Sequence, residues 1–76
     1  MNTLNEVKLY EKVYVDSIQQ KMHMKRRLMD LGFVNGVEVI PILENPGRNM
    51  RAYLIKGCKI ALRKEDSQYI LVKERE

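Results

Sequence analysis

The sequence predicts a small, mainly β domain in which about five antiparallel strands form a strongly bent barrel. One short helix is expected after the first strand and one helical turn before the last. The chain has 76 residues, the length of one small domain. Short β-branched segments alternate with turn residues along most of it. At this length a single sheet that curls around one core is favoured over two packed sheets.

The first strand is expected over residues 13–18, where β-branched and polar side chains are interleaved. Residues 19–31 follow as a short helix, because Met24, Leu28 and Leu31 are spaced by four and three and form one apolar stripe. The chain therefore leaves its first strand through a helix before the remaining strands begin.

The end of this helix is predicted from Gly32 and Phe33. Glycine readily takes the left-handed conformation that follows many helices, and the next residue can then fold back onto the last helical turn. We therefore expect a Schellman-type cap in which Phe33 packs against Leu28.

The longest strand is expected over residues 37–43, after a turn at Asn35 and Gly36. Pro41 lies inside this strand and lacks a backbone N–H group, so the strand should bulge there or lie at an edge. The later elements are separated by residues that favour turns. In chain order they are a loop (44–49), a strand (51–55), a tight turn at Lys56 and Gly57, a strand (58–62), a helical turn (63–67) and a last strand (69–72).

One domain is expected over residues 1–76, with an ordered core over about 5–73 and frayed ends. The residues expected in or near the core are mostly β-branched or leucine. They are Val13, Val15, Leu28, Leu31, Phe33, Val37, Val39, Tyr53, Ile55, Ile60, Leu62 and Ile70.

The single cysteine, Cys58, rules out an intramolecular disulfide and favours a reducing compartment. It begins a predicted strand, so we expect a buried, inert thiol. The longest apolar run, residues 39–43, is too short to span a bilayer, and the first residues lack the apolar segment of a signal peptide. The sequence therefore predicts a cytoplasmic protein.

A net charge of +4 raises the alternative of a basic, nucleic-acid-binding barrel. Only Lys21, Lys25, Arg26 and Arg27 form a tight basic cluster, and the aromatic residues that would stack bases are widely spread. The distribution favours a solvated surface, and no nucleic-acid partner is expected.

No catalytic or metal-binding set is evident, so neither an enzyme nor a cofactor is expected. His23 lies between Met22 and Met24, but neighbouring residues on a helix point about 100° apart and cannot converge on one ion. A surface histidine with packing methionines is the favoured reading. The chain also has no phosphate-binding glycine loop and no evident acid–base pair.

Two separated blocks, RRLMDLGFVNG and IALR, resemble the FeoA family of ferrous-iron transport proteins. The similarity covers about residues 13–72. Glu11 stands where the family commonly has glycine, and Met50 where it has a second proline. The matching positions are Arg27, Leu28, Leu31, Gly32, Phe33, Gly36, Val39, Pro46, Gly57, Ile60, Ala61, Leu62, Arg63, Ile70 and Val72.

This resemblance implies an SH3-like barrel in the bacterial cytoplasm that assists FeoB, a membrane transporter of ferrous iron with its own GTP-binding domain. Transition-metal binding is implied for the family as a whole. Similar domains form the C-terminal part of metal-dependent repressors, so a free-standing relative of that domain is an alternative. Within the family motif, we expect Leu28, Leu31, Gly32, Gly36 and Gly57 to have structural roles.

The expected docking surface combines the loop and the helix end, with Arg48, Asn49, Met50 and Phe33 as contact residues. Loops on a rigid barrel are common recognition sites, and methionine offers an adaptable apolar contact. An arginine in a loop can also act as a finger in a partner's nucleotide site, although most loop arginines are solvated or bind carboxylates. The partner-binding role is therefore preferred for Arg48.

Overall fold

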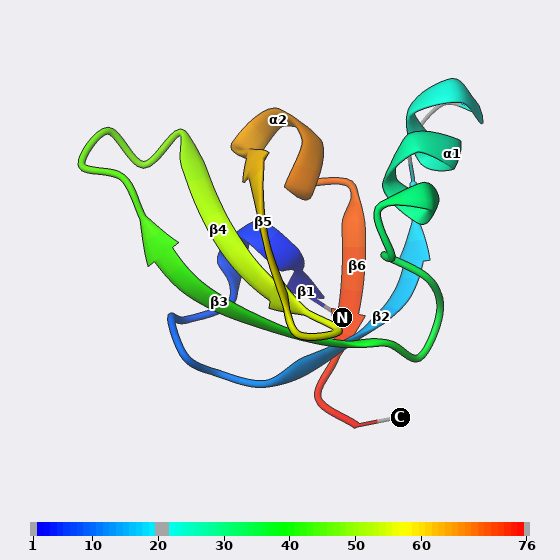
Figure 1. Cartoon of the computed structure of the whole chain (residues 1–76), viewed down its shortest axis with the longest axis horizontal. Coiled ribbons are helices and arrows are strands. Elements are labelled where there is room, and N and C mark those ends of the chain that lie inside the picture. Colours follow the sequence, from blue (N-terminus) through cyan, green and yellow to red (C-terminus); the bar gives the residue numbers. More distant parts are fainter. Residues whose placement is uncertain (1, 20–21, 76) are drawn as a thin grey trace.

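The computed structural model describes residues 2–19 and 22–75, and it consists of one strongly bent, six-stranded antiparallel sheet with two short helices (Figure 1). The strand order is β1-β6-β2-β3-β4-β5. In chain order the elements are β1 (Asn2–Thr3), the 3₁₀ helix η1 (Leu4–Glu6), β2 (Val13–Ile18), α1 (Met22–Asp30), β3 (Glu38–Glu44), β4 (Met50–Ile55), β5 (Cys58–Arg63), α2 (Lys64–Ser67) and β6 (Ile70–Lys73). The predicted mainly β fold is confirmed, with β1 as an additional short strand.

The sheet bends at two irregularities in strand pairing. In β3 the register with β4 shifts between Pro41 and Leu43, as expected for a proline that cannot donate to the ladder. In β2 the register with β6 shifts between Val15 and Ser17. Bulges increase local twist, so both help the sheet to curl around its inner face.

The predicted cap of α1 is confirmed. The Phe33 amide donates to the Leu28 carbonyl (3.1 Å) and the Gly32 amide donates to the Met29 carbonyl (3.0 Å), which are the two bonds of a Schellman motif. Gly32 has φ +112°, and both Phe33 and Leu28 are buried in the core. The cap therefore turns the chain from the helix directly into the hydrophobic core.

One contiguous core fills the inner face of the sheet. Phe33 and Tyr53 meet edge to face at its centre, with ring centroids 6.5 Å apart. Val37 and Ile60, which were expected in or near the core, are partly buried against it. The buried apolar residues are Leu4, Val7, Val13, Val15, Ile18, Leu28, Phe33, Val39, Tyr53, Ile55, Leu62, Ile70 and Val72.

The core position predicted for Leu31 is wrong, since 40% of this residue is exposed. Leu31 follows the last residue of α1, Asp30, and the cap then places Phe33 in the core. The side chain of Leu31 instead lines a surface groove beside β5. The prediction failed because the apolar spacing of the sequence continues one residue beyond the end of the helix.

The N-terminal segment is part of the core, and the predicted start near residue 5 is too late. Leu4 has no exposed surface, and Asn2 and Thr3 pair with Val72 and Leu71 of β6. The Thr3 amide donates to the Glu6 carboxylate at 3.2 Å, which closes η1. The sequence Thr-x-x-Glu is a capping-box pattern and could have revealed this turn.

Arg51 is the charged residue that holds this segment in place. It lies on β4, only 6% exposed, and its guanidinium donates to the carbonyl oxygens of Leu4 (3.3 Å), Asn5 (3.0 Å) and Val7 (2.6 Å). Its Nε lies 3.2 Å from a carboxylate oxygen of Glu44. A buried cation thus links β4 to the N-terminal turn.

The β4–β5 hairpin turns at Lys56 and Gly57, as predicted. Both residues have positive φ (51° and 78°), which is the pattern of a type I′ turn. Cys58 follows at once and is exposed, so the expectation of a buried thiol is wrong. The reason is its place at the tip of the hairpin, beyond the part of β5 that covers the core.

Tyr53 makes stability depend on pH at the alkaline end. Burial raises the pKa of Tyr53, while the Ser67 hydroxyl and the Arg51 cation oppose this shift by smaller amounts. The unfolded chain therefore loses this proton first, above about pH 10, and the folded state is then penalised. We expect the free energy of unfolding of the wild type to fall relative to Tyr53→Phe as the pH rises through 10. Urea titrations of both proteins at pH 7 and above 10 test this, and an unchanged difference would contradict it.

Candidate functional site

The loop between β3 and β4 (residues 45–49) has a defined conformation, because Asn45 bonds across its base. The Asn45 side-chain oxygen accepts hydrogen bonds from the backbone N–H groups of Asn49 (3.0 Å) and Met50 (3.1 Å). The backbone N–H of Asn45 in turn donates to the Met50 carbonyl (3.1 Å). These bonds satisfy the backbone where the strands separate. The predicted docking residues therefore sit on a closed loop at one end of the sheet.

Arg48 is strongly exposed, with 84% of its side chain accessible and a long ion pair of 4.0 Å to Glu44. It has φ 57°, so the loop turns sharply there. Asn49 is also exposed, and Met50 is partly exposed at the start of β4. Three of the four predicted contact residues are thus brought together on one surface.

Phe33 does not belong to that surface. It is completely buried and packs against Tyr53, so the predicted contact role is replaced by a structural one. The helix-end cap is responsible, because it directs the side chain inward. Met50, at the start of β4, is the exposed apolar residue beside the loop.

Met50 connects the loop to an apolar outer face of the sheet, formed by Leu43, Met50, Ala52, Leu54 and Ala61. The face follows from the register, since Leu43 pairs with Ala52, which pairs with Ala61. A shallow hollow of about 330 Å³ lies over it. Leu43 and Leu54 are among the exposed large hydrophobic residues. Sequence reasoning found Met50 but did not find this face, because it depends on which strands are neighbours.

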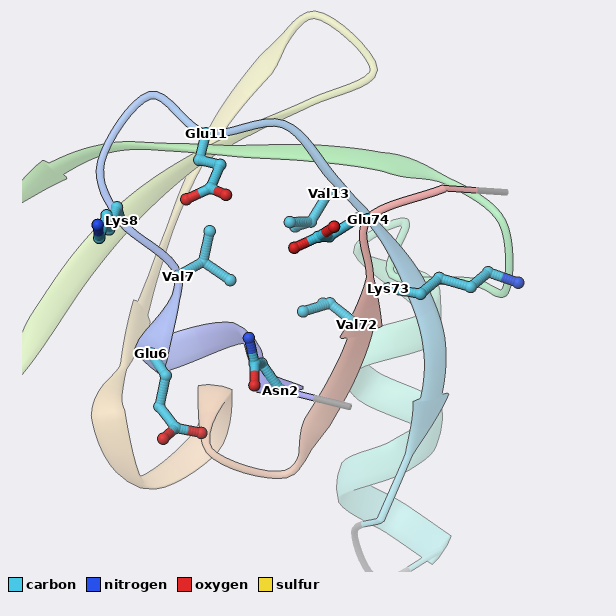
Figure 2. A pocket seen from close by; sticks show the side chains of 9 residues that line it. All are labelled: Asn2, Glu6, Val7, Lys8, Glu11, Val13, Val72, Lys73 and Glu74. Carbon is cyan, nitrogen blue, oxygen red and sulfur yellow. The ribbon is translucent and has the colours of Figure 1, made fainter.

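Further hollows lie on the described surface, and one of about 590 Å³ beside the loop is lined by Asn49, Met50, Arg63, Lys64 and Glu65. A groove of about 430 Å³ runs between α1 and β5 and is lined by residues of both, including Leu28, Leu31 and Leu62. A pocket of about 500 Å³ lies at the N-terminal end of the sheet. Its lining includes the apolar side chains of Val7 and Val72, and Figure 2 shows Glu11 and Glu74 reaching over it from opposite sides.

The arrangement offers no evident metal centre or catalytic constellation in the described part of the chain. Residues 2–19 and 22–75 contain no group of three or more His, Cys, Asp or Glu that could hold a metal ion. The side chains of Met22 and His23 lie outside the described residues, so the prediction made for them stays open. Met24 is partly buried and lines the groove beside β5.

Basic residues are interleaved with acids on the folded surface as well. Lys12 pairs with Glu38 and Lys73 with Asp16, and both pairs are at least partly exposed. Phe33 and Tyr53 are buried, whereas Tyr10 and Tyr69 are exposed at widely separated positions of the sequence. Lys25, Arg26 and Arg27 are exposed together on α1, and elsewhere on the described surface the basic residues are mixed with acids.

Comparison with known protein families adds a decisive observation. The model of the FeoA domain matches residues 2–74. The chain belongs to the FeoA family. Family membership associates it with ferrous-iron transport, and the resemblance of the RRLMDLGFVNG and IALR blocks is confirmed.

Solved structures of FeoA proteins resemble this chain in both sequence and fold. A FeoA-like protein from Clostridium acetobutylicum is 33% identical, with 95% of this chain and 84% of that chain covered and a TM-score of 0.86. FeoA from Stenotrophomonas maltophilia, solved with zinc and described as an SH3 domain protein, is 30% identical, with 96% and 91% covered and a TM-score of 0.85. The SH3-like fold is thereby confirmed.

The repressor ScaR, solved with Zn²⁺, shares the fold at 18% identity and a TM-score of 0.84, with 97% of this chain but 37% of that chain covered. This similarity concerns the fold alone. No curated protein sequence matches the chain significantly. Among the described residues, no helix is long and apolar enough to cross a membrane.

Proposed function

We propose that this FeoA-family protein is a non-catalytic, cytoplasmic accessory protein of bacterial ferrous-iron uptake. It docks onto the cytosolic GTP-binding region of a FeoB-type transporter through Arg48, Asn49 and Met50. The family match supports the pathway. The S. maltophilia relative is described as a possible activating factor of ferrous-iron transport, which supports an accessory role.

The observation that carries the docking site is the juxtaposition of an exposed arginine with an apolar face. The Asn45 bonds hold the loop, so Arg48 projects at the rim while Met50 joins the outer apolar face with Leu43. Protein interfaces commonly have an apolar centre and a polar rim, and arginine and methionine are enriched in them. Ordered loop geometry also lowers the entropy lost on binding.

We expect Arg48→Glu and Met50→Asp each to weaken docking by about tenfold or more, because one reverses a rim charge and the other puts a charge into the apolar centre. Both side chains are exposed, so the melting temperature should change by only a few degrees. Interferometry against the isolated cytosolic region of the transporter measures the affinity, after circular dichroism has shown that each variant is folded.

Lys8→Glu is the matched control, because Lys8 is exposed and lines a different pocket, which it shares with Val72 and Lys73 of β6. It should bind like the wild type. Failure of the wild type to bind either the cytosolic region or the full transporter in detergent would refute the proposed partner. Binding that survives both loop substitutions would keep the partner and move the contact elsewhere.

A further inference from the structure

One side of β5 pairs with no other strand of the described residues. In the hairpin with its two-residue turn, Ile55 and Cys58 form the first bonded pair, and bonded pairs then alternate along the ladder. The amide of Lys64 donates to the carbonyl of Asn49 (2.9 Å), which continues the same alternation. The N–H and C=O groups of Lys59, Ala61 and Arg63 consequently point away from β4.

This side of β5 is the long free edge of the sheet. β5 ends the strand order, and within the described residues the backbone groups of Lys59 and Ala61 and the N–H of Arg63 have no hydrogen bond outside the ladder with β4. The carbonyl of Arg63 instead begins α2 as its N-cap group. All three residues are exposed. Figure 1 shows β4 on the other side of β5. An edge of this kind is a template for one more strand.

The groove beside the edge offers side chains of such a strand both apolar residues and the charged residues Arg27, Glu65 and Asp66. It is lined on one side by α1, through Leu28 and Leu31, and on the other by Leu62 of β5. Leu28 and Leu62 are buried and Leu31 is 40% exposed. Because side chains of a strand alternate, every second residue of an added strand would face this groove.

The charges on the edge indicate which strand fits. Lys59 and Arg63 lie on the outer face on either side of Ala61. A second copy pairing antiparallel about Ala61 would set Lys59 opposite Arg63, and like charges placed directly opposite are destabilising. Carboxylates four residues apart on another chain would form two favourable cross-strand pairs instead.

We propose that β5 binds an extended segment of the transporter's cytosolic region by strand addition. The segment carries acidic side chains opposite Lys59 and Arg63 and apolar side chains between them that enter the groove. This inference rests on the function proposed above. It is continuous with the loop site, because Met50 pairs directly with Arg63 and lines the same groove. Main-chain hydrogen bonds supply affinity in this mode, and side-chain pockets supply specificity.

Amide hydrogen exchange tests the proposal directly. The ¹⁵N-labelled chain is measured alone and with a saturating amount of the isolated cytosolic region. Strand addition should slow exchange at the amides of Lys59, Ala61 and Arg63 by about tenfold or more, since these groups gain partners. The amides of Ile60 and Leu62, already bonded to β4, should change less. A complex in which the three edge amides exchange as fast as in the free chain overturns strand addition while leaving the docking partner intact.

Ala61→Pro and Ala61→Ser form a matched pair of variants. The N–H of Ala61 faces away from β4, and edge strands tolerate a proline at such a position. Proline removes this N–H, whereas serine keeps it. Ala61→Pro should therefore weaken binding by about tenfold more than Ala61→Ser, which also changes the side chain on the apolar face but keeps the N–H. The double variant Lys59→Glu, Arg63→Glu should also weaken binding by about tenfold, because it reverses both charges that face the acidic side chains. If Ala61→Pro does not fold, the exchange experiment on the wild type decides.

Three other outcomes would reject the proposal. Protection of the edge amides in the free protein at high concentration, with a dimer in analytical ultracentrifugation, would identify a second copy as the occupant. A wild type that binds no form of the transporter would remove the partner and this inference together. Equal binding by Ala61→Pro and Ala61→Ser, with both folded, would also reject it.

Discussion

Arg51→Ala is expected to leave a large fraction of the protein, about half, unfolded at 25 °C. The substitution removes a buried guanidinium that serves the carbonyl oxygens of Leu4, Asn5 and Val7 and pairs with Glu44. Removing one partner of a buried ionic network costs about 3–5 kcal/mol. A domain of this size has only about 3–5 kcal/mol of stability from its core. The loss is therefore comparable to the whole free energy of unfolding.

Circular dichroism and urea titration measure this effect, with Arg63→Ala as the matched control. Arg63 is an arginine on the neighbouring strand that is 70% exposed and pairs only with Glu65 at the surface. Its removal should change stability by about 0.5 kcal/mol or less. A urea midpoint for Arg51→Ala equal to that of Arg63→Ala would show that the N-terminal segment does not depend on the guanidinium.

Gly32→Val should have the second largest effect on stability, lowering the free energy of unfolding by about 1–2 kcal/mol or more. Gly32 has φ +112°, which a β-branched residue adopts only with strain. A Cβ there would lie 3.5 Å from the Ile55 side chain, an ordinary contact, so the cost comes from the backbone and from displacement of Phe33. The shift of the urea midpoint at constant slope measures it.

Gly47→Val is the control for this prediction. Gly47 lies in the exposed loop without positive φ, and a Cβ there would meet the Asn49 side chain at 3.5 Å. Its substitution should leave the midpoint nearly unchanged. Equal midpoints for the two variants would mean that the cap of α1 tolerates a side chain at Gly32.

The features predicted correctly from the sequence are those that depend on neighbours in the chain. A glycine after a short apolar stripe led to the Schellman cap, with the bond from Phe33 to Leu28. Pro41 led to the irregularity in β3, since it has no N–H to donate. Lys56 and Gly57 marked the hairpin turn. Each is determined by backbone geometry within a few residues.

The exposure of the loop was predicted for the same reason. Pro46 and Gly47 indicate a turn, and residues in turns are usually exposed, as Arg48 is. Phe33 was assigned to the surface and to the core at once, and the fold decided for the core. The outer apolar face and the free edge of β5 were not predictable, because both require the strand order.

The sequence by itself thus determined the turns, the helix cap, the approximate strands and the family, all of which are encoded in short segments or in their order. Only the tertiary structure decided that Arg51 points inward, that Leu4 enters the core and that Cys58 does not. Residues on one strand face either the core or solvent according to register, and a shift of one residue exchanges the faces. Register is set by partners distant in sequence, as when Arg51 binds carbonyl groups more than forty residues away.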